Sequence, residues 1–204
     1  MDSQKLIDTA QALVVKSKGI LAADESGGTI KRRFDSINVE STEDNRRDYR
    51  EMLFRTEGVS DYISGVILFD ETIKQNGADG TPIVKVLLDR GIIPGIKVDK
   101  GTQSLPGSPS ELVTEGLDGL RARLEEYASL GAGFTKWRGV ITIGEGIPTP
   151  YCIEANAHAL ARFAALSQEA GLVPIVEPEV LMDGDHSIDQ CFEANEATLK
   201  EVFA

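Results

Sequence analysis

The sequence predicts an α/β fold built on a parallel β-sheet. Three observations support this prediction: short apolar segments bounded by glycine or proline, helical patterns between them, and the regular alternation of the two along the 204 residues. Such alternation is typical of right-handed βαβ units, which place their strands parallel in one sheet. Two closures of that sheet remain open, an open doubly wound sheet and a (β/α)8 barrel.

Five short segments have the composition of parallel strands that are buried on both faces. No G-x-G-x-x-G motif follows the first of them, and no Walker A sequence occurs in the chain. This absence weakens the nucleotide-binding version of the open sheet. We expect the strands at residues 19–24, 64–69, 94–99, 133–141 and 172–180.

Four segments show the apolar spacing of helices, with apolar residues three or four positions apart. Ser41-x-x-Asp44 resembles a capping box before the helix around Tyr49, and Gly131 is the expected stop of the helix that contains Leu117 and Tyr127. A last helical pattern, residues 197–204, has no C-cap glycine. The four segments are residues 5–15, the stretch around Tyr49, Met52 and Leu53, the stretch from Leu117 to Tyr127, and the stretch from Ile153 to Ala164.

Composition and charge exclude several classes of partner. A formal net charge of −12 argues against binding to duplex nucleic acid, which requires a clustered basic surface. No segment approaches the roughly 18 apolar residues of a membrane span, and the N-terminus lacks the features of a signal peptide. Two cysteines, Cys152 and Cys191, make no disulfide framework. We therefore expect a cytoplasmic protein that binds neither nucleic acid nor membranes.

Charged residues occur in three of the predicted strands, although buried parallel strands should be apolar. They form pairs with a spacing of two, so both members of a pair point to the same face of the sheet. We expect these charges in the C-terminal half of their strand or just beyond it, where a barrel places its active site. The pairs are Lys97 and Asp99, Lys136 and Arg138, and Glu177 and Glu179, while Asp24-Glu25 and Asp70-Glu71 end the first two strands.

These charges have two interpretations. A single pair at a strand end is more often solvated or paired with a neighbouring strand. Three spaced pairs on consecutive strands are harder to explain in that way, because unpaired buried charges are costly. Bases on the third and fourth strands beside acids on the first and fifth predict a mixed-charge pocket that binds phosphate and moves protons.

The remaining candidate groups give weaker signals. The segment from Ser26 to Thr29 could offer N–H groups and hydroxyls to a phosphate, or could simply be a flexible loop with a helix cap. His158 lies in a predicted helix and His186 in a predicted turn, so they predict no zinc site. Neither Cys152 nor Cys191 has an assignable activating partner, so both are expected to be unreactive.

In these strands and charges the sequence resembles the class I fructose-bisphosphate aldolases, the Schiff-base type. The matching stretches occur in order, at compatible spacing, over essentially the whole chain. They are residues 19–26, 65–69, 95–101, 116–120, 136–138, 173–179 and 183–186.

The resemblance implies a (β/α)8 TIM barrel, of which residues 1–204 hold about the first five βα units as one partial domain. It implies reversible cleavage of fructose 1,6-bisphosphate to dihydroxyacetone phosphate and glyceraldehyde 3-phosphate, in glycolysis and gluconeogenesis. In this family a lysine forms an imine with the substrate ketone, and the iminium accepts electrons during carbon–carbon cleavage. It implies no metal and no other cofactor, a sugar-phosphate partner, and a homo-oligomeric full-length protein.

The resemblance also assigns roles to individual residues. Asp24 would assist carbinolamine formation and proton transfer at the cleaved bond, and Glu177 would be the general acid/base for imine formation. Lys136 would support this chemistry electrostatically, and Glu179 would help to position the lysines. The phosphate on the aldehyde half would be held by Ser26, Thr29, Lys97 and Arg138.

The chain departs from the family pattern in three places. The segment Ser26-Gly27-Gly28-Thr29 differs at its second position from Ser-Thr-Gly-Ser/Thr, and residues 102–115 match poorly. The Leu-Leu-Lys-Pro-like motif that carries the imine-forming lysine, on the sixth strand, is absent, as are the loops for the ketone-side phosphate. Five strands do not close an eight-stranded barrel. We therefore expect the N-terminal part of a longer protein, with little or no activity by itself.

Two other hypotheses remain open. A non-catalytic sugar-phosphate-binding or scaffold protein of aldolase ancestry would bind phosphate weakly without turnover. A different barrel lyase would instead use Lys97 or Lys136 as its imine-forming lysine. Borohydride reduction in the presence of dihydroxyacetone phosphate would then leave an adduct on this chain.

Overall fold

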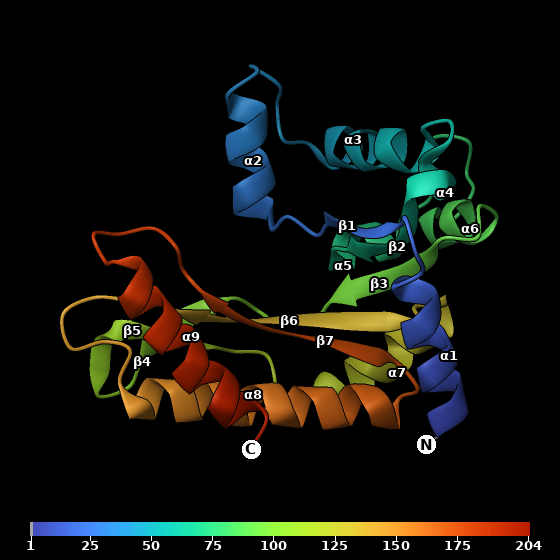
Figure 1. Cartoon of the computed structure of the whole chain (residues 1–204). Helices are drawn as coiled ribbons and strands as arrows, with labels where there is room; N and C mark the ends of the chain where they lie inside the picture. The colour runs from blue at the N-terminus through green and yellow to red at the C-terminus, as the bar shows by residue number, and fades with distance from the viewer. Residues whose placement is uncertain (1) are drawn as a thin grey trace.

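A curved sheet of five parallel strands forms the centre of the molecule (Figure 1). The computed structural model describes residues 2–204. The strand order is β1-β2-β3-β6-β7, so the strands follow one another around the sheet without reversal. This order is that of a (β/α) barrel, because a doubly wound sheet reverses its strand order at a switch point. The strands are β1 (Gly19–Ala23), β2 (Ile63–Leu68), β3 (Ile93–Lys97), β6 (Phe134–Ile141) and β7 (Val173–Val180).

The predicted strands and helices are all present. Each strand begins within one residue of its expected position, because short apolar runs ending at glycine or proline are a local signal. None of the helices formed by residues 2–204 combines the length and apolar character needed to cross a membrane. The confirmed helices are α1 (Ser3–Leu13), α3 (Glu43–Arg55), α7 (Leu120–Leu130), α8 (Pro150–Glu169) and α9 (Ile188–Val202).

Two helix starts differ from the prediction. The N-cap of α3 is Thr42, not Ser41, because the Thr42 hydroxyl accepts the hydrogen bond from the Asn45 backbone N–H at 3.1 Å. Helix α7 begins at Leu120 because Gly119 before it adopts a left-handed conformation, with φ at 68°. The predicted stop at Gly131 is confirmed, since this residue closes α7 with φ at 104°.

Six short elements are absent from the sequence-based prediction. The two strands form an antiparallel hairpin between β3 and α7, in the segment that matches the family pattern poorly. The sequence pattern does not predict helix α6, because this helix is almost entirely apolar and four of its six residues are buried. Such a run has no polar face and therefore no helical periodicity. The six elements are α2 (Gly27–Asp35), α4 (Val59–Tyr62), α5 (Asp70–Ile73), α6 (Ile83–Leu88), β4 (Thr102–Leu105) and β5 (Ser108–Thr114).

The two faces of the sheet carry different apolar layers. On the outer face Trp137 of β6 stacks on Phe163 of α8, with ring centroids 5.6 Å apart. On the inner face Leu13, Ile67 and Phe134 form a small layer at the amino ends of the strands. A Cβ atom at Gly95 would lie only 2.3 Å from the Phe134 ring, so the neighbouring strand must carry glycine there. The apolar inner layer leaves the carboxyl ends of the strands to polar side chains.

Candidate active site

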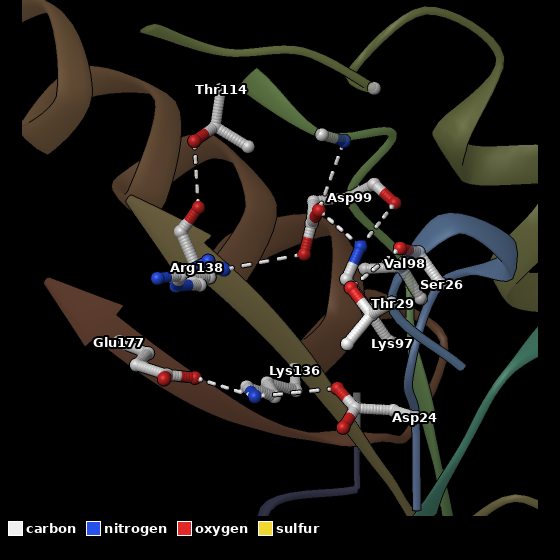
Figure 2. Close-up of polar contacts among 12 residues, drawn as sticks. Asp24, Ser26, Thr29, Lys97, Val98, Asp99, Thr114, Lys136, Arg138 and Glu177 are labelled. Atoms are coloured by element: carbon white, nitrogen blue, oxygen red, sulfur yellow. Dashed lines mark hydrogen bonds and ion pairs between the residues drawn. The ribbon is translucent and has the colours of Figure 1, made fainter. Parts of the chain in front are cut away.

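A lysine between two carboxylates forms the centre of the site (Figure 2). Lys136 Nζ lies 3.3 Å from Asp24 Oδ2 and 3.0 Å from Glu177 Oε2. Asp24 directly follows β1, whereas Lys136 lies on β6, three positions further along the sheet. In a flat sheet these strands would be roughly 14 Å apart. Only the curvature of the sheet brings the two side chains together, as the predicted mixed-charge pocket requires.

The environment of Lys136 keeps its ammonium group charged. Its side chain is only 14% exposed. Burial by itself would lower the pKa of Lys136, but the charge of Asp24 and the hydrogen bond to Glu177 outweigh burial and raise the pKa above its ordinary value. Because imine formation needs a neutral amine, this geometry disfavours the hypothesis that Lys136 itself attacks a ketone.

Arg138 lies on the same face of β6, two residues beyond Lys136. Its guanidinium pairs with Glu179, and this hydrogen bond raises the pKa of Arg138 above its ordinary value. Each base of β6 thus contacts the acid of β7 that lies two residues beyond its register partner. The resemblance implied that Glu179 positions the lysines, but among residues 2–204 its ion-pair partner is the arginine, because Glu177 already occupies Lys136.

Lys97 ends β3 and faces Lys136 in the sheet register. Its ammonium group does not join the Asp24–Glu177 cluster; it pairs with Asp99 two residues further along. Asp99 is absent from the set of site residues expected from the sequence. Its signal was the spacing of two from Lys97, which places both side chains on one face.

Ser26 and Thr29 lie at the start of α2. Ser26 is the N-cap residue, but its side chain makes no capping hydrogen bond. Its Oγ atom instead lies 3.1 Å from Thr29 Oγ1. Ser26 and Lys97 line one cavity of about 570 Å³. The structure therefore places two of the four expected phosphate-binding side chains around a common space, beside an open helix N-terminus.

The acidic residues after β2 have ion-pair partners other than Lys136, although Asp70 lines the same cavity as Ser26 and Lys97. Asp70 accepts a hydrogen bond from the Tyr127 hydroxyl at 2.7 Å and pairs with Lys74 at 2.9 Å. Burial and the Asp70 contact raise the pKa of Tyr127 to about 12. Glu71 pairs with Arg46 of α3. These acids therefore join α5 to α7 and α3, and neither forms an ion pair with Lys136.

Cys152 lies at a helix N-terminus, a position that can activate a thiol. It lies in the first turn of α8, where its N–H donates to the Thr149 side chain at 3.2 Å. Burial and the nearby Glu111 carboxylate nevertheless raise the pKa of the Cys152 thiol to about 11. The thiol stays protonated and unreactive. Among residues 2–204 no group of three or more His, Cys, Asp and Glu side chains is placed to hold a metal ion.

A curved parallel sheet with lysines and carboxylates at its carboxyl ends is typical of the (β/α)-barrel class of proteins. The family described as fructose-bisphosphate aldolase class-I has a sequence model that matches residues 5–204. The chain therefore belongs to the class I fructose-bisphosphate aldolase family.

Individual relatives agree with this assignment. The chain is 65% identical over 203 residues to a protein of Xanthomonas campestris named probable fructose-bisphosphate aldolase class 1. It is 54% identical over 201 residues to the cytoplasmic isozyme of fructose-bisphosphate aldolase from Spinacia oleracea. The solved fructose-bisphosphate aldolase of Plasmodium falciparum, crystallised with TRAP and a small-molecule inhibitor, superposes with a TM-score of 0.96 at 50% identity.

These relatives are longer than the present chain. The match covers 100% of this chain and 61% of the Xanthomonas protein, and 98% of this chain and 56% of the spinach protein. In the Plasmodium structure the corresponding shares are 98% and 58%. The chain thus spans about three-fifths of the length of the aldolases that it matches.

Proposed function

We propose that the protein carrying this chain is a Schiff-base fructose-bisphosphate aldolase of glycolysis and gluconeogenesis. It cleaves fructose 1,6-bisphosphate reversibly to dihydroxyacetone phosphate and glyceraldehyde 3-phosphate. Family membership supports the proposal, and the observation that carries it is the Lys136 ammonium between Asp24 and Glu177 at the carboxyl ends of the strands. We further propose a cytoplasmic homo-oligomer, consistent with the spinach relative, which is named a cytoplasmic isozyme.

The three central residues fit the proton transfers of this chemistry. An amine adds to the substrate ketone to give a carbinolamine, which loses its hydroxyl as water when Glu177 donates a proton. Asp24 then accepts the proton of the C4 hydroxyl as the C3–C4 bond breaks, and the bonding electron pair flows into the iminium. The Lys136 ammonium lies within 3.3 Å of both carboxyl groups, so its positive charge balances the negative charge that either of them carries during these proton transfers.

The phosphate on the aldehyde half fits the cationic side of the site. Lys97 and Arg138 supply positive charge, and Ser26 and Thr29 supply hydroxyl donors. An ammonium group has three donors. Lys97 directs donors to the carboxylate and the backbone carbonyl of Asp99, which leaves one for a phosphate oxygen.

A trapping experiment identifies the lysine that forms the imine. The natural gene product is incubated with dihydroxyacetone phosphate and borohydride, and the modified lysine is located by peptide mass mapping. We expect an adduct on a lysine other than Lys97 and Lys136, together with cleavage of fructose 1,6-bisphosphate. An adduct on either of those two lysines would favour a different barrel lyase. The absence of both an adduct and cleavage would overturn the proposal. Omission of the dihydroxyacetone phosphate is the control.

A further inference from the structure

Asp99 is a buried carboxylate that bridges two strands at the carboxyl end of the sheet. Its side chain is only 3% exposed. One oxygen, Oδ1, accepts hydrogen bonds from Lys97 Nζ and from the Gly101 backbone N–H, the latter at 3.1 Å. The other oxygen, Oδ2, accepts the backbone N–H of Arg138 at 3.4 Å. Figure 2 shows Asp99 between the Lys97 ammonium and the Arg138 backbone.

We propose that Asp99 is a positioning residue, which fixes the Lys97 ammonium relative to β6 so that Lys97 and Arg138 meet the same phosphate group. This inference rests on the proposed function and assigns Asp99 a role in binding the aldehyde-side phosphate. Asp99 does not touch the phosphate in this role; it acts through Lys97.

The flexibility of the Lys97 side chain explains why a positioning residue is needed. Lysine has a long stem with several rotatable bonds, so an ammonium at the end of β3 has no preferred position by itself. The two backbone N–H donors hold the Asp99 carboxylate in place, and the carboxylate in turn holds Lys97. The cost of ordering the lysine is therefore met during folding and not during substrate binding.

The backbone around Asp99 strengthens the same link. The N–H of Val98 donates to the carbonyl of Lys136 at 3.0 Å, beyond the last paired residues of β3. The hydroxyl of Thr114, on β5, donates to the carbonyl of Arg138 at 2.7 Å. Arg138 is thus held through both its N–H and its carbonyl, which fixes the position of its backbone relative to Asp99.

The test compares two substrates that differ only in the phosphate concerned. Fructose 1,6-bisphosphate carries the aldehyde-side phosphate and fructose 1-phosphate lacks it. The natural gene product is assayed as wild type, Asp99→Asn, Lys97→Met and the double variant. Glu111→Gln is the matched control, because Glu111 is also buried and accepts hydrogen bonds from Thr149, but contacts neither cation.

We expect Asp99→Asn to raise KM for fructose 1,6-bisphosphate roughly 3- to 10-fold, the scale of ordering one flexible side chain. KM for fructose 1-phosphate should change less than about 2-fold, and the Glu111→Gln control should change neither KM. In the Lys97→Met background the Asp99→Asn substitution should have no further effect, because its target is gone.

Three results would overturn the inference. An equal rise in KM for both substrates, or an additive effect in the Lys97→Met background, would show a purely structural role. A fall in KM would show that Asp99 merely repels the phosphate. If Asp99→Asn does not fold, Asp99→Glu, which moves the charge by one methylene group, replaces it. This variant is assayed with both substrates and in the Lys97→Met background, and the same changes in KM are expected.

The inference and the proposed function fail in different ways. If the wild-type protein cleaves neither sugar phosphate, the proposed function fails. The same proteins are then titrated with inorganic phosphate in a calorimeter. The role of Asp99 would still be supported if Asp99→Asn weakens phosphate binding in the wild-type background and has no effect in the Lys97→Met background. Unchanged phosphate binding by Asp99→Asn would refute it.

Discussion

The inner face of the sheet has two ends of opposite character, and β6 passes through both. Phe134, Lys136 and Arg138 point to this same face because they are spaced by two residues. At the amino end Phe134 packs against Leu13 and Ile67. At the carboxyl end Lys136 pairs with Asp24 and Glu177, 3.3 and 3.0 Å away. One strand thus supports both an apolar layer and a charged layer.

The difference between the two ends separates stability from chemistry. Burial of apolar side chains stabilises the fold by roughly 25 cal/mol per Å². Buried ion pairs often give no net stabilisation, because desolvation offsets their attraction. We therefore expect the amino-end layer to hold the fold and the carboxyl-end layer to perform the reaction, and four experiments test this division.

The largest expected effect is on turnover. Asp24→Asn in the natural gene product should lower kcat roughly 10²- to 10⁴-fold, because a proton acceptor is lost. The free energy of unfolding should change by only about 1 kcal/mol, since Glu177 still neutralises Lys136. Steady-state kinetics and urea unfolding measure the two effects. Asp35→Asn is the matched control, because Asp35 pairs with Lys31 on the surface. A kcat within twofold of wild type would break the division.

The next effect is on stability at the opposite end. Phe134→Ala should lower the free energy of unfolding by about 3 to 5 kcal/mol, because it leaves a cavity against Leu13 and Ile67. Urea unfolding followed by circular dichroism measures the change. Phe192→Ala is the control on α9, where the ring is 66% exposed, and it should cost less than about 0.5 kcal/mol. A similar loss in both variants would contradict the role of the inner layer.

A smaller effect is the loss of folding stability at alkaline pH, which we expect from Tyr127 and its contact with Asp70 after β2. The pKa of Tyr127 is raised to about 12 in the folded protein, by burial and by Asp70. The unfolded tyrosine ionises near pH 10, so this stabilisation is complete below pH 10 and is lost as the pH rises toward 12. The loss should be about 2 kcal/mol.

Unfolding curves recorded between pH 9 and 12 test this prediction. Tyr127→Phe should reduce the alkaline slope of stability, whereas Phe134→Ala should lower stability by the same amount at every pH. An unchanged slope in Tyr127→Phe would show that the hydroxyl contact with Asp70 does not control the alkaline transition.

The smallest effect is on the acid side. The hydrogen bond from Arg46 holds the pKa of Glu71 below its ordinary value. Its contribution to stability is present above the ordinary pKa of glutamate and is lost as the pH falls through the lowered value. Glu71→Gln should therefore flatten the acid slope, by less than about 1 kcal/mol because the pair is partly exposed. Melting temperatures from pH 3 to 7 measure the slope. Glu196→Gln is the control, because Glu196 pairs with Lys200 on the surface of α9. An equal flattening by Glu196→Gln would argue against a specific effect of the Arg46–Glu71 pair.

Local sequence patterns predict the strands of the sheet and the end of the sheet at which charged residues gather. Short apolar runs and spacing of two are properties of neighbouring residues, so they predict the strands and place Lys136 and Arg138 on one face. They also predict that charges gather at the carboxyl ends, beside Asp24 and Glu177. They do not predict the short elements such as α6, whose apolar run has no periodicity.

The partner of each charged residue depends on the three-dimensional fold. Asp24 reaches Lys136 because the sheet curves across three strand positions, a property of the whole sheet. Glu179 pairs with Arg138, and not with a lysine, because the register of β6 and β7 offsets each pair. Asp99 bridges β3 and β6 through backbone donors that no side-chain pattern reveals. Contacts between distant strands depend on curvature and register, and local spacing encodes neither.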